Sequence, residues 1–214
     1  FIVHLYGNES AIKKEFKRYN ISEHYTKIIH TDDTVSDEET VLKAIKSSKN
    51  TSMWNCVQAQ LDEKADISLS AGNTGVLLVI SKMILKTMNK VDKPALAGLW
   101  PSKKGMTVVL DLGANIECNE KNLIDFSELG SALYKSIFLT EKPHVALLNI
   151  GSEEIKGTEI LKKTFPKLKE LSSKGNFIFD GYIEGNNLME GNSNVIVTDG
   201  FTGNIALKTA EGTA

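Results

Sequence analysis

The chain has 214 residues, of which 41% are hydrophobic and 24% charged, and 25 basic residues against 27 acidic residues give a formal net charge of −2. This composition is that of an ordinary globular protein with enough chain for a sizeable core, and it excludes a miniprotein held together by disulfides. Because the net charge is close to zero, binding of nucleic acid through many phosphate contacts is not expected.

The first half of the chain alternates between strand-like and helix-like patterns. β-Branched and alternating apolar residues mark the strands, while helical spacing of apolar residues and acidic first turns mark the helices. The expected strands cover residues 1–6, 28–29 and 67–70, and the expected helices cover residues 9–18, 37–47, 53–63 and 74–88. This order of strands and helices is typical of an α/β protein.

The second half continues the alternation. The expected strands cover residues 95–100, 107–112, 144–150, 176–183 and 194–198, and the expected helices cover residues 121–138 and 156–171, with a last helix after residue 204. Residues 101–105 predict a hairpin-like connection between the first two of these strands. We expect a single α/β domain over residues 1–214, with a mostly parallel sheet covered on both faces, the doubly wound class.

Both ends of the sequence predict an internal piece of a longer protein. Phe1 opens directly on a strand, and residues 209–214 stop inside the last expected helix. The longest apolar run, around residues 74–85, is shorter than the roughly 20 residues that a membrane span needs. No signal peptide is visible in the sequence.

Four predicted turns share a signature of small and amide residues. They are residues 70–75 (SAGNTG), 111–115 (DLGAN), 149–153 (NIGSE) and 199–204 (DGFTGN). In an open parallel sheet, ligands bind outside the carboxyl ends of the strands, so we expect these turns to converge on one crevice. Glycine permits close backbone approach, and the first N–H groups of a following helix can hold an anion. The signature predicts a phosphate or acyl-oxyanion site.

A plainer interpretation applies to each turn taken alone. A glycine-rich turn between a strand and a helix is most often only a tight turn with a helix cap, and none of the four matches a Walker A loop or a dinucleotide fingerprint. Thr74, and Thr202 or Asn204, are candidate helix caps or ligand donors. Asp111 and Asp199 each admit three roles, namely helix cap, loop anchor or proton acceptor, with capping favoured.

Few residues carry other special chemistry. Arg18 is the sole arginine of the sequence, so an anion must be held by lysine or by backbone N–H groups. Lys156 reaches such an anion if it lies in the first turn of its helix, although solvated surface is the commoner role of a lysine. Cys56 and Cys118 lie outside any C-x-x-C pattern, and the four histidines lack metal-ligand spacing, so we expect no metal site and no redox pair.

At these turns the chain closely resembles the bacterial phosphate acyltransferases of phospholipid synthesis, the PlsX family. The resembling segments are residues 67–78 (ISLSAGNTGVLL), 108–118 (VVLDLGANIEC), 126–138 (FSELGSALYKSIF), 145–159 (VALLNIGSEEIKGTE) and 195–212 (VIVTDGFTGNIALKTAEG). Their combination in this order is far more specific than any single segment. The family often has arginine where this chain has Met53-Trp54, and again within residues 184–187.

The resemblance implies a Rossmann-like, three-layer α/β/α sandwich, similar to the phosphotransacetylase and isocitrate-dehydrogenase-like groups, usually as a homodimer. The implied reaction is reversible transfer of a fatty acyl group from acyl-acyl carrier protein to inorganic phosphate, giving an acyl-phosphate for a downstream glycerol-3-phosphate acyltransferase. No metal and no dissociable cofactor are implied. The implied location is cytoplasmic, with peripheral membrane contact through a region that would follow residue 214.

The resemblance also implies which residues line the site. The lining residues are Ser70, Gly72, Thr74, Gly75, Asp111, Asn115, Gly151, Asp199, Gly200, Thr202 and Gly203. We expect phosphate itself to attack the thioester, so that a Ser-His-Asp triad is not needed, and none is evident. Neutral donors would stabilise the oxyanion while a lysine attracts phosphate. The residues expected in these catalytic roles are Asn73, Asn149 and Asn204 as donors and Lys156 as the cation.

Two other functions stay open at this point. One is a non-catalytic module that binds an anion or an acyl-phosphate. The other is a phosphotransacetylase-like enzyme that acts on acyl-coenzyme A.

Overall fold

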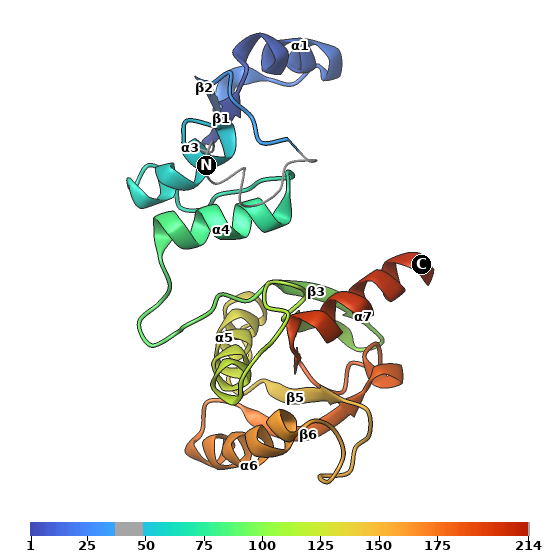
Figure 1. Cartoon of the computed structure of the whole chain (residues 1–214). Coiled ribbons are helices and arrows are strands. Elements are labelled where there is room, and N and C mark those ends of the chain that lie inside the picture. Colours follow the sequence, from blue (N-terminus) through green and yellow to red (C-terminus); the bar gives the residue numbers. More distant parts are fainter. Residues whose placement is uncertain (37–48, 214) are drawn as a thin grey trace. The chain divides into compact units, whose positions relative to one another are not determined.

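The structure is a computed structural model that describes residues 1–36 and 49–213. The chain forms two units, Phe1–Met88 and Asn89–Ala214, whose elements are labelled in Figure 1. The helix expected over residues 37–47 lies outside the described residues. The single domain expected over residues 1–214 stays a prediction.

The first unit holds a small parallel sheet and three α-helices in its described part. Its elements are β1 (Val3–Gly7), α1 (Glu9–Tyr19), η1 (Glu23–Tyr25), β2 (Thr26–His30), α3 (Ser52–Leu61) and α4 (Thr74–Leu85). Strand β1 pairs in parallel with β2. Helices α3 and α4 pack together around Val57, Val76 and Ile80, all of which are fully buried. The strands and helices predicted for the described part of this unit are confirmed with small shifts at their ends, except for one strand.

The strand expected at residues 67–70 is wrong. This segment runs beside α3 without a strand partner in the described part of the chain. The Ser68 hydroxyl donates to the Cys56 carbonyl oxygen at 3.0 Å, and the Cys56 Sγ donates to the Leu69 carbonyl oxygen at 3.7 Å. Ile67 and Leu69 are 82% and 90% exposed. The alternating pattern was misleading because its apolar side chains face solvent instead of a core.

The second unit is built on a five-stranded sheet. Its strands are β3 (Ala97–Ser102), β4 (Gly105–Leu110), β5 (His144–Asn149), β6 (Ile178–Glu184) and β7 (Val195–Val197). The strand order is β3-β4-β7-β5-β6. Strand β3 runs antiparallel to β4 through a two-residue hairpin at Lys103 and Lys104, and the other neighbours pair in parallel. The mostly parallel sheet and the hairpin are therefore confirmed.

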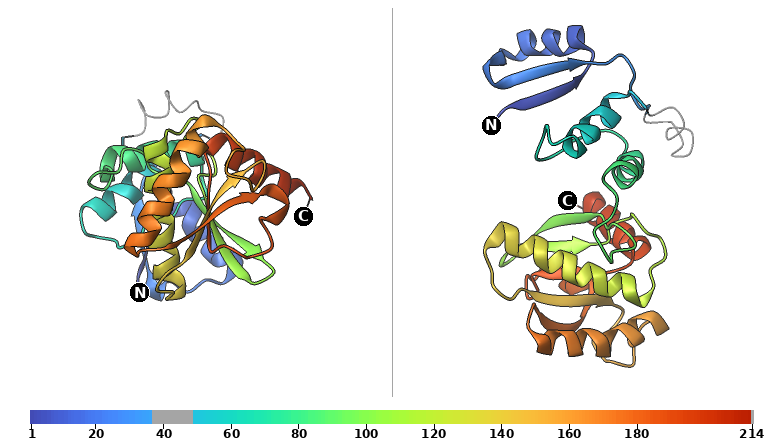
Figure 2. Two further views of the ribbon diagram at one scale, coloured as in Figure 1. Left: turned by 90° about the horizontal axis from the view of Figure 1, so that it is seen from below. Right: turned by 90° about the vertical axis from the view of Figure 1, so that its left-hand side faces the viewer.

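Helices cover both faces of this sheet, as the views in Figure 2 show. The helical elements are α5 (Glu120–Phe138), α6 (Glu159–Lys174), η2 (Gly185–Asn187) and α7 (Gly200–Thr213). Helices α5 and α6 pack on one face, where Phe126 and Leu168 join a core with Val145 and Leu147. Helix α7 packs on the other face around Ile196. The arrangement is the α/β/α sandwich that the resemblance implied.

The order of connections opens a crevice beside β7. Strand β7 lies between β4 and β5. The chain leaves β4 and β5 toward α5 and α6 on one face, whereas it leaves β7 toward α7 on the opposite face. Neighbouring strands whose helices lie on opposite faces form a topological switch point, where ligands bind in open α/β sheets. The turns after β4, β5 and β7 carry three of the four predicted motifs.

Candidate functional site

The turn after β4 is organised by one buried carboxylate. Asp111 has no exposed surface. One of its oxygens, Oδ1, accepts hydrogen bonds from the backbone N–H groups of Leu96, Gly113 and Ala114 at 2.9–3.1 Å. The other oxygen, Oδ2, accepts from the backbone N–H and the side-chain amide of Asn115 at 2.8 and 2.7 Å. Asp111 is therefore a loop anchor, and the favoured interpretation of this residue as a helix cap is wrong.

The turn after β7 belongs to helix α7. The helix begins at Gly200, so residues 200–204 are helical, and the expected start after residue 204 is wrong. The Asp199 carboxylate accepts hydrogen bonds from the Thr202 N–H at 2.8 Å and from its hydroxyl at 2.9 Å. This is the geometry of an N-cap. Asp199 caps the helix, as expected, whereas Thr202 and Asn204 do not.

The start of α7 interlocks with the turn after β4. The Gly200 N–H donates to the Asn115 carbonyl oxygen at 2.8 Å, and the Asn204 amide donates to the Leu112 carbonyl oxygen at 3.3 Å. A Cβ at Gly203 would overlap the Asp111 carbonyl oxygen. The glycine thus permits close packing of a helix on a strand end. The Gly200 N–H is occupied within the protein, so it is not a free anion donor.

The turn after β5 is more open. Asn149 is 7% exposed, and its Oδ1 accepts from the Ile150 N–H at 2.8 Å while its amide donates to the Lys156 carbonyl oxygen at 3.2 Å. Gly151, another predicted site residue, is buried directly after this strand. The residues from 152 to 156 are exposed. The amide of Asn149 therefore holds the two ends of the turn together without filling its middle.

Lys156 lies in this turn and not in a helix. Gly157 has a φ of +90°, a left-handed conformation that interrupts a helix. Thr158 then caps α6, which begins at Glu159. The expectation that Lys156 occupies the first turn of its helix is thus wrong. Its side chain is exposed, and its ammonium group has no ion-pair partner among residues 1–36 and 49–213.

Two cavities open beside Asp199 at the carboxyl ends of the strands. The larger of these two, about 800 Å³, is lined by Asn149, Asp199 and Thr202 among others. The other, about 620 Å³, is lined by Cys118, Thr158 and Asp199 among others. Both cavities lie at the switch point next to β7. Three of the predicted turns therefore lie side by side, since the turn at 199–204 contacts the turn at 111–115 and shares a cavity with the turn at 149–157.

Most of the cavity lining lies outside the predicted motifs. Six further residues of the larger cavity are Leu148, Leu161, Glu184, Leu188, Ile205 and Ala206. The apolar ones have the pattern of ordinary core residues. One signal in the sequence was Ile205, an apolar residue directly after the motif at 199–204; in the structure its side chain is 52% exposed.

Cys118 lines the smaller cavity, but its surroundings make its thiol unreactive. It is 7% exposed, and its Sγ donates to the Asn115 carbonyl oxygen at 3.7 Å. Burial raises the pKa of the Cys118 thiol. Because the thiolate is the nucleophilic form, a raised pKa makes the sulfur inert near neutral pH. Cys118 therefore serves packing of the core.

The fourth motif, residues 70–75, belongs to the first unit. Asn73 caps α4 by accepting from the Val76 N–H at 3.1 Å, so the cap is Asn73 and not Thr74, while Gly75 lies in the first helical turn. The Ser70 hydroxyl accepts from the Gly72 N–H at 3.2 Å. Ser70 and Gly72 line a cavity of about 300 Å³ within this unit. Convergence of all four motifs stays a prediction.

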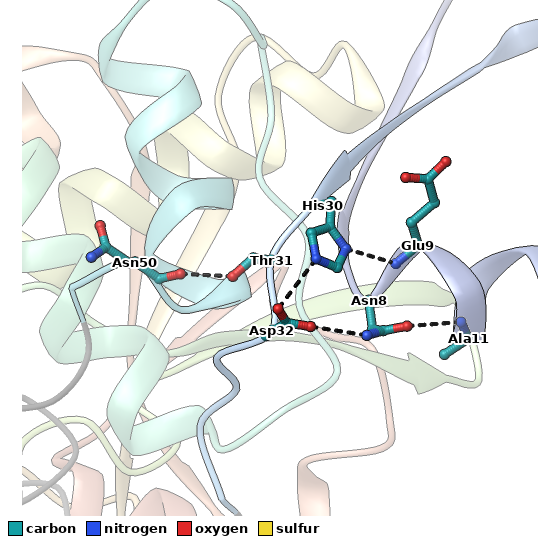
Figure 3. A network of polar contacts seen from close by, with 7 residues as sticks. All are labelled: Asn8, Glu9, Ala11, His30, Thr31, Asp32 and Asn50. Carbon is teal, nitrogen blue, oxygen red and sulfur yellow. Dashed lines mark hydrogen bonds and ion pairs between the residues drawn. The ribbon is translucent and has the colours of Figure 1, made fainter.

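The first unit also holds a polar network that the sequence analysis did not identify, shown in Figure 3. His30 Nδ1 accepts from the Glu9 N–H at 3.2 Å, so its other nitrogen, Nε2, carries the proton that it shares with Asp32 at 3.3 Å. Asn8 caps α1 and donates to the same Asp32 carboxylate at 3.0 Å. The network joins the carboxyl ends of β1 and β2. Its polar groups satisfy one another, which fits a structural role.

Comparison with known proteins identifies the family. The family described as "Fatty acid synthesis protein" matches residues 1–214. The chain belongs to this family. A curated relative from Pelagibacter ubique, named phosphate acyltransferase, is 56% identical over 210 residues, and one of the same name from Azorhizobium caulinodans is 42% identical over 211 residues. Each match covers 98% of this chain, which spans 62% and 59% of the length of these relatives.

Solved structures of similar fold have distant sequences. The EutD phosphotransacetylase from Staphylococcus aureus matches with a TM-score of 0.66 and 17% identity, covering 97% of this chain and 73% of that protein. A branched-chain phosphotransacylase from Enterococcus faecalis matches with a TM-score of 0.64 and 14% identity, covering 100% of this chain and 84% of that protein. At this identity the likeness shows the Rossmann-like α/β fold alone.

No helix in the described part of the chain is long and apolar enough to cross a membrane. No group of three or more histidine, cysteine, aspartate or glutamate side chains in residues 1–36 and 49–213 is arranged to hold a metal ion.

Proposed function

We propose that the chain is part of an enzyme that reversibly transfers a fatty acyl group from acyl-acyl carrier protein to inorganic phosphate, giving acyl-phosphate. The observation that carries the proposal is the cavity next to β7, which joins Asn149 and Asp199, from two of the motifs, to a largely apolar lining. The relatives named phosphate acyltransferase and the fatty acid synthesis family support both substrates.

In the proposed reaction, phosphate is the nucleophile. A phosphate oxygen attacks the thioester carbonyl carbon and forms a tetrahedral oxyanion, after which the carbon–sulfur bond breaks. The pantetheine sulfur leaves as a thiolate and takes a proton from solvent, so no side chain becomes acylated. The protein must hold the two reactants together and stabilise the oxyanion.

Lys156 is the cation that we assign to phosphate. Its ammonium group is exposed beside the β5 turn and has no ion-pair partner in the described chain. The loop that carries it is closed at both ends by Asn149 and by the cap of α6. Because this loop is short and anchored at both ends, binding of an anion by Lys156 at the switch point would cost little conformational entropy of the loop.

Amide side chains are the proposed oxyanion donors. Each carries two N–H groups. The amide of Asn149 uses one of them for the Lys156 carbonyl oxygen, and that of Asn204 uses one for the Leu112 carbonyl oxygen. The second N–H of each has no partner among residues 1–36 and 49–213, and we propose that it donates to the oxyanion. We propose the same role for Asn73, with Thr74, at the start of α4.

The remaining predicted residues position these groups or bind the anion by their backbone. Asp111 and Asn115 fix the turn after β4, and Asp199 with Thr202 fixes the start of α7. Glycines make close backbone approach possible. The glycines proposed for backbone N–H contact with phosphate are Gly75 and Gly151, with the hydroxyl of Ser70 from the same motif as Gly75. We propose that Gly72, Gly200 and Gly203, whose N–H groups donate to acceptors within the protein, only permit close approach of the backbone.

The proposed setting follows from this reaction. The acyl donor is acyl-acyl carrier protein, and the acyl-phosphate product passes to a glycerol-3-phosphate acyltransferase. We propose that the whole protein is a cytoplasmic homodimer with peripheral contact to the membrane. No metal or cofactor takes part in the proposed chemistry.

One assay separates this function from its alternatives. The protein, extended to the length of its relatives, is incubated with palmitoyl-acyl carrier protein and phosphate, and the released carrier thiol is measured. We expect release that depends on phosphate and is much slower with palmitoyl-coenzyme A. Release from the coenzyme A thioester alone would instead identify a phosphotransacetylase-like enzyme. No release from either thioester would favour a module that only binds an anion or an acyl-phosphate.

A further inference from the structure

The larger cavity beside β7 has a polar part and an apolar part. Its polar residues lie where strands end, with Asn149 at the end of β5, Glu184 at the end of β6 and Asp199 directly after β7. Its apolar residues come from several elements, namely Leu148 within β5, Ile150 after it, Leu161 on α6, Leu188 after η2, and Ile205 and Ala206 on α7. A helix rises about 5.4 Å per turn, so Ile205 and Ala206 carry one side of the lining along α7 beyond its first turn.

The apolar part joins buried side chains of the core to the more exposed Ile150 and Ile205. Leu148 and Leu188 are 7% and 8% exposed and belong to the hydrophobic cluster between the sheet and α7. Ala206 packs against the same cluster from the helix. Alanine is the smallest apolar side chain in this lining. A larger side chain at position 206 would therefore occupy part of the cavity.

The charges of the cavity decide what it can hold. Glu184 and Asp199 are its charged lining residues, and within the described chain no lysine or arginine lines it. Two carboxylates repel a phosphate or another anion. A neutral, apolar group is therefore the suitable occupant, while the exposed Lys156 lies outside this lining and remains for the anion.

We propose that this cavity holds the fatty acyl chain of the donor thioester and that Ala206 sets the length of chain it accepts. The proposal rests on the function proposed above and adds the place and the selecting residue for the acyl group. The volume of about 800 Å³ falls within the 300–1,000 Å³ range of ligand pockets. The thioester carbonyl then lies at the polar end, next to Asn149, where phosphate attacks.

Filling the cavity should shift the preferred chain length. Ala206→Leu adds three carbon atoms to the wall, and each methylene excluded from an apolar site weakens binding about fourfold. We expect the ratio of kcat/KM for palmitoyl- over decanoyl-acyl carrier protein to fall about tenfold or more. Ala206→Val should give a smaller change in the same direction.

Ala210 provides a matched control on the same helix. It is also partly buried against the same cluster, one turn further along α7, but does not line the cavity. Ala210→Leu should leave the palmitoyl-to-decanoyl ratio unchanged. Thermal melting of all three variants shows which of them remain folded, and Ala206→Val carries the test if Ala206→Leu is unfolded.

A binding measurement separates failure of this inference from failure of the proposed function. Fluorescence anisotropy of labelled palmitoyl- and decanoyl-acyl carrier protein, without phosphate, gives the chain preference without any reaction. Thiol release with an unchanged chain ratio in the folded Ala206 variants would overturn the inference and leave the function standing. No thiol release, with a palmitoyl preference that Ala206→Leu removes, would overturn the function and leave the cavity as an acyl site. Absence of any chain preference in wild-type binding and transfer would also overturn the inference.

Discussion

Two turns of the second unit, on either side of the turn after β7, share a sequence signature but differ in structure. Residues 111–115 and 149–153 both begin with Asp or Asn at a strand end and continue to a glycine two residues later. The Asp111 carboxylate gathers five hydrogen bonds and closes its turn, whereas the Asn149 Oδ1 accepts one and leaves its turn exposed. We propose that the closed turn supports the site and that the open one takes part in the chemistry.

The difference follows from the acceptor capacity of the two side chains. A carboxylate offers two acceptor oxygens, while an amide offers one and carries donors on its nitrogen. Asp111 can therefore hold several backbone N–H groups at once. Asn149 holds only the two ends of a longer loop, whose middle includes Lys156.

Removing the anchor of the closed turn should have the largest effect. Asp111→Ala leaves five donors without their acceptor in a fully buried place. Each unsatisfied buried donor costs about 1–3 kcal/mol, so we expect a loss of at least about 4 kcal/mol in the free energy of unfolding. Urea denaturation, or failure to obtain folded protein, checks this. A loss below about 1 kcal/mol would contradict the role of Asp111 as anchor.

Removing the cation of the open turn should affect activity and not folding. Lys156→Ala should slow phosphate-dependent acyl transfer about 10²–10³-fold, the usual effect of losing one pre-organised group that stabilises charge in the transition state. Its stability should change by less than about 0.5 kcal/mol because the side chain is exposed. Lys163→Ala is the control, since Lys163 is also exposed and, in the described chain, unpaired. Equal activity of the two variants would refute the assignment of Lys156.

Close packing of α7 on the closed turn gives the next largest effect. Gly203→Ala places a methyl group on the Asp111 carbonyl oxygen, and such overpacking costs about 1–3 kcal/mol. Gly212→Ala on the same helix is the control, because open space surrounds that position. It should stabilise by up to about 1 kcal/mol, the helical advantage of alanine over glycine. Calorimetric melting of both variants tests the contrast, which disappears if both melt alike.

The helix cap at Asp199 should contribute least. Asp199→Ala removes the acceptor for the Thr202 N–H and hydroxyl. Loss of an N-cap costs about 1 kcal/mol, well below the cost at Asp111, because the freed groups are near solvent. Denaturant titration gives this value, and a loss as large as that of Asp111→Ala would mean that both turns are equally closed.

The secondary structure was predictable where burial in the core determines the pattern of apolar residues in the sequence. Strand β5 is buried along most of its length, so its sequence HVALLN is a continuous apolar run. Residues 67–70 have a similar propensity, yet local contacts to α3 place them as an exposed segment. Helix boundaries failed where a glycine decided them, as Gly157 did before α6.

The site was predictable in place and less so in detail. Parallel strand ends necessarily share one edge of the sheet, so the motifs at 111–115, 149–153 and 199–204 could be expected to lie together. The hydrogen-bond partners within the site could not be predicted from the sequence, because partners such as Asn115 and Gly200 are far apart along the chain. The apolar cavity lining was missed for the same reason.

Phosphate titration of glycine-labelled protein tests the contrast between the two turns most directly. In protein of the relatives' length carrying ¹⁵N-glycine, nuclear magnetic resonance reports Gly113 in the closed turn and Gly151 and Gly157 in the open one. We predict that inorganic phosphate shifts the signals of Gly151 and Gly157 in a saturable manner and leaves Gly113 unmoved. A shift of Gly113 alone, or no shift at Gly151 and Gly157, would contradict the account.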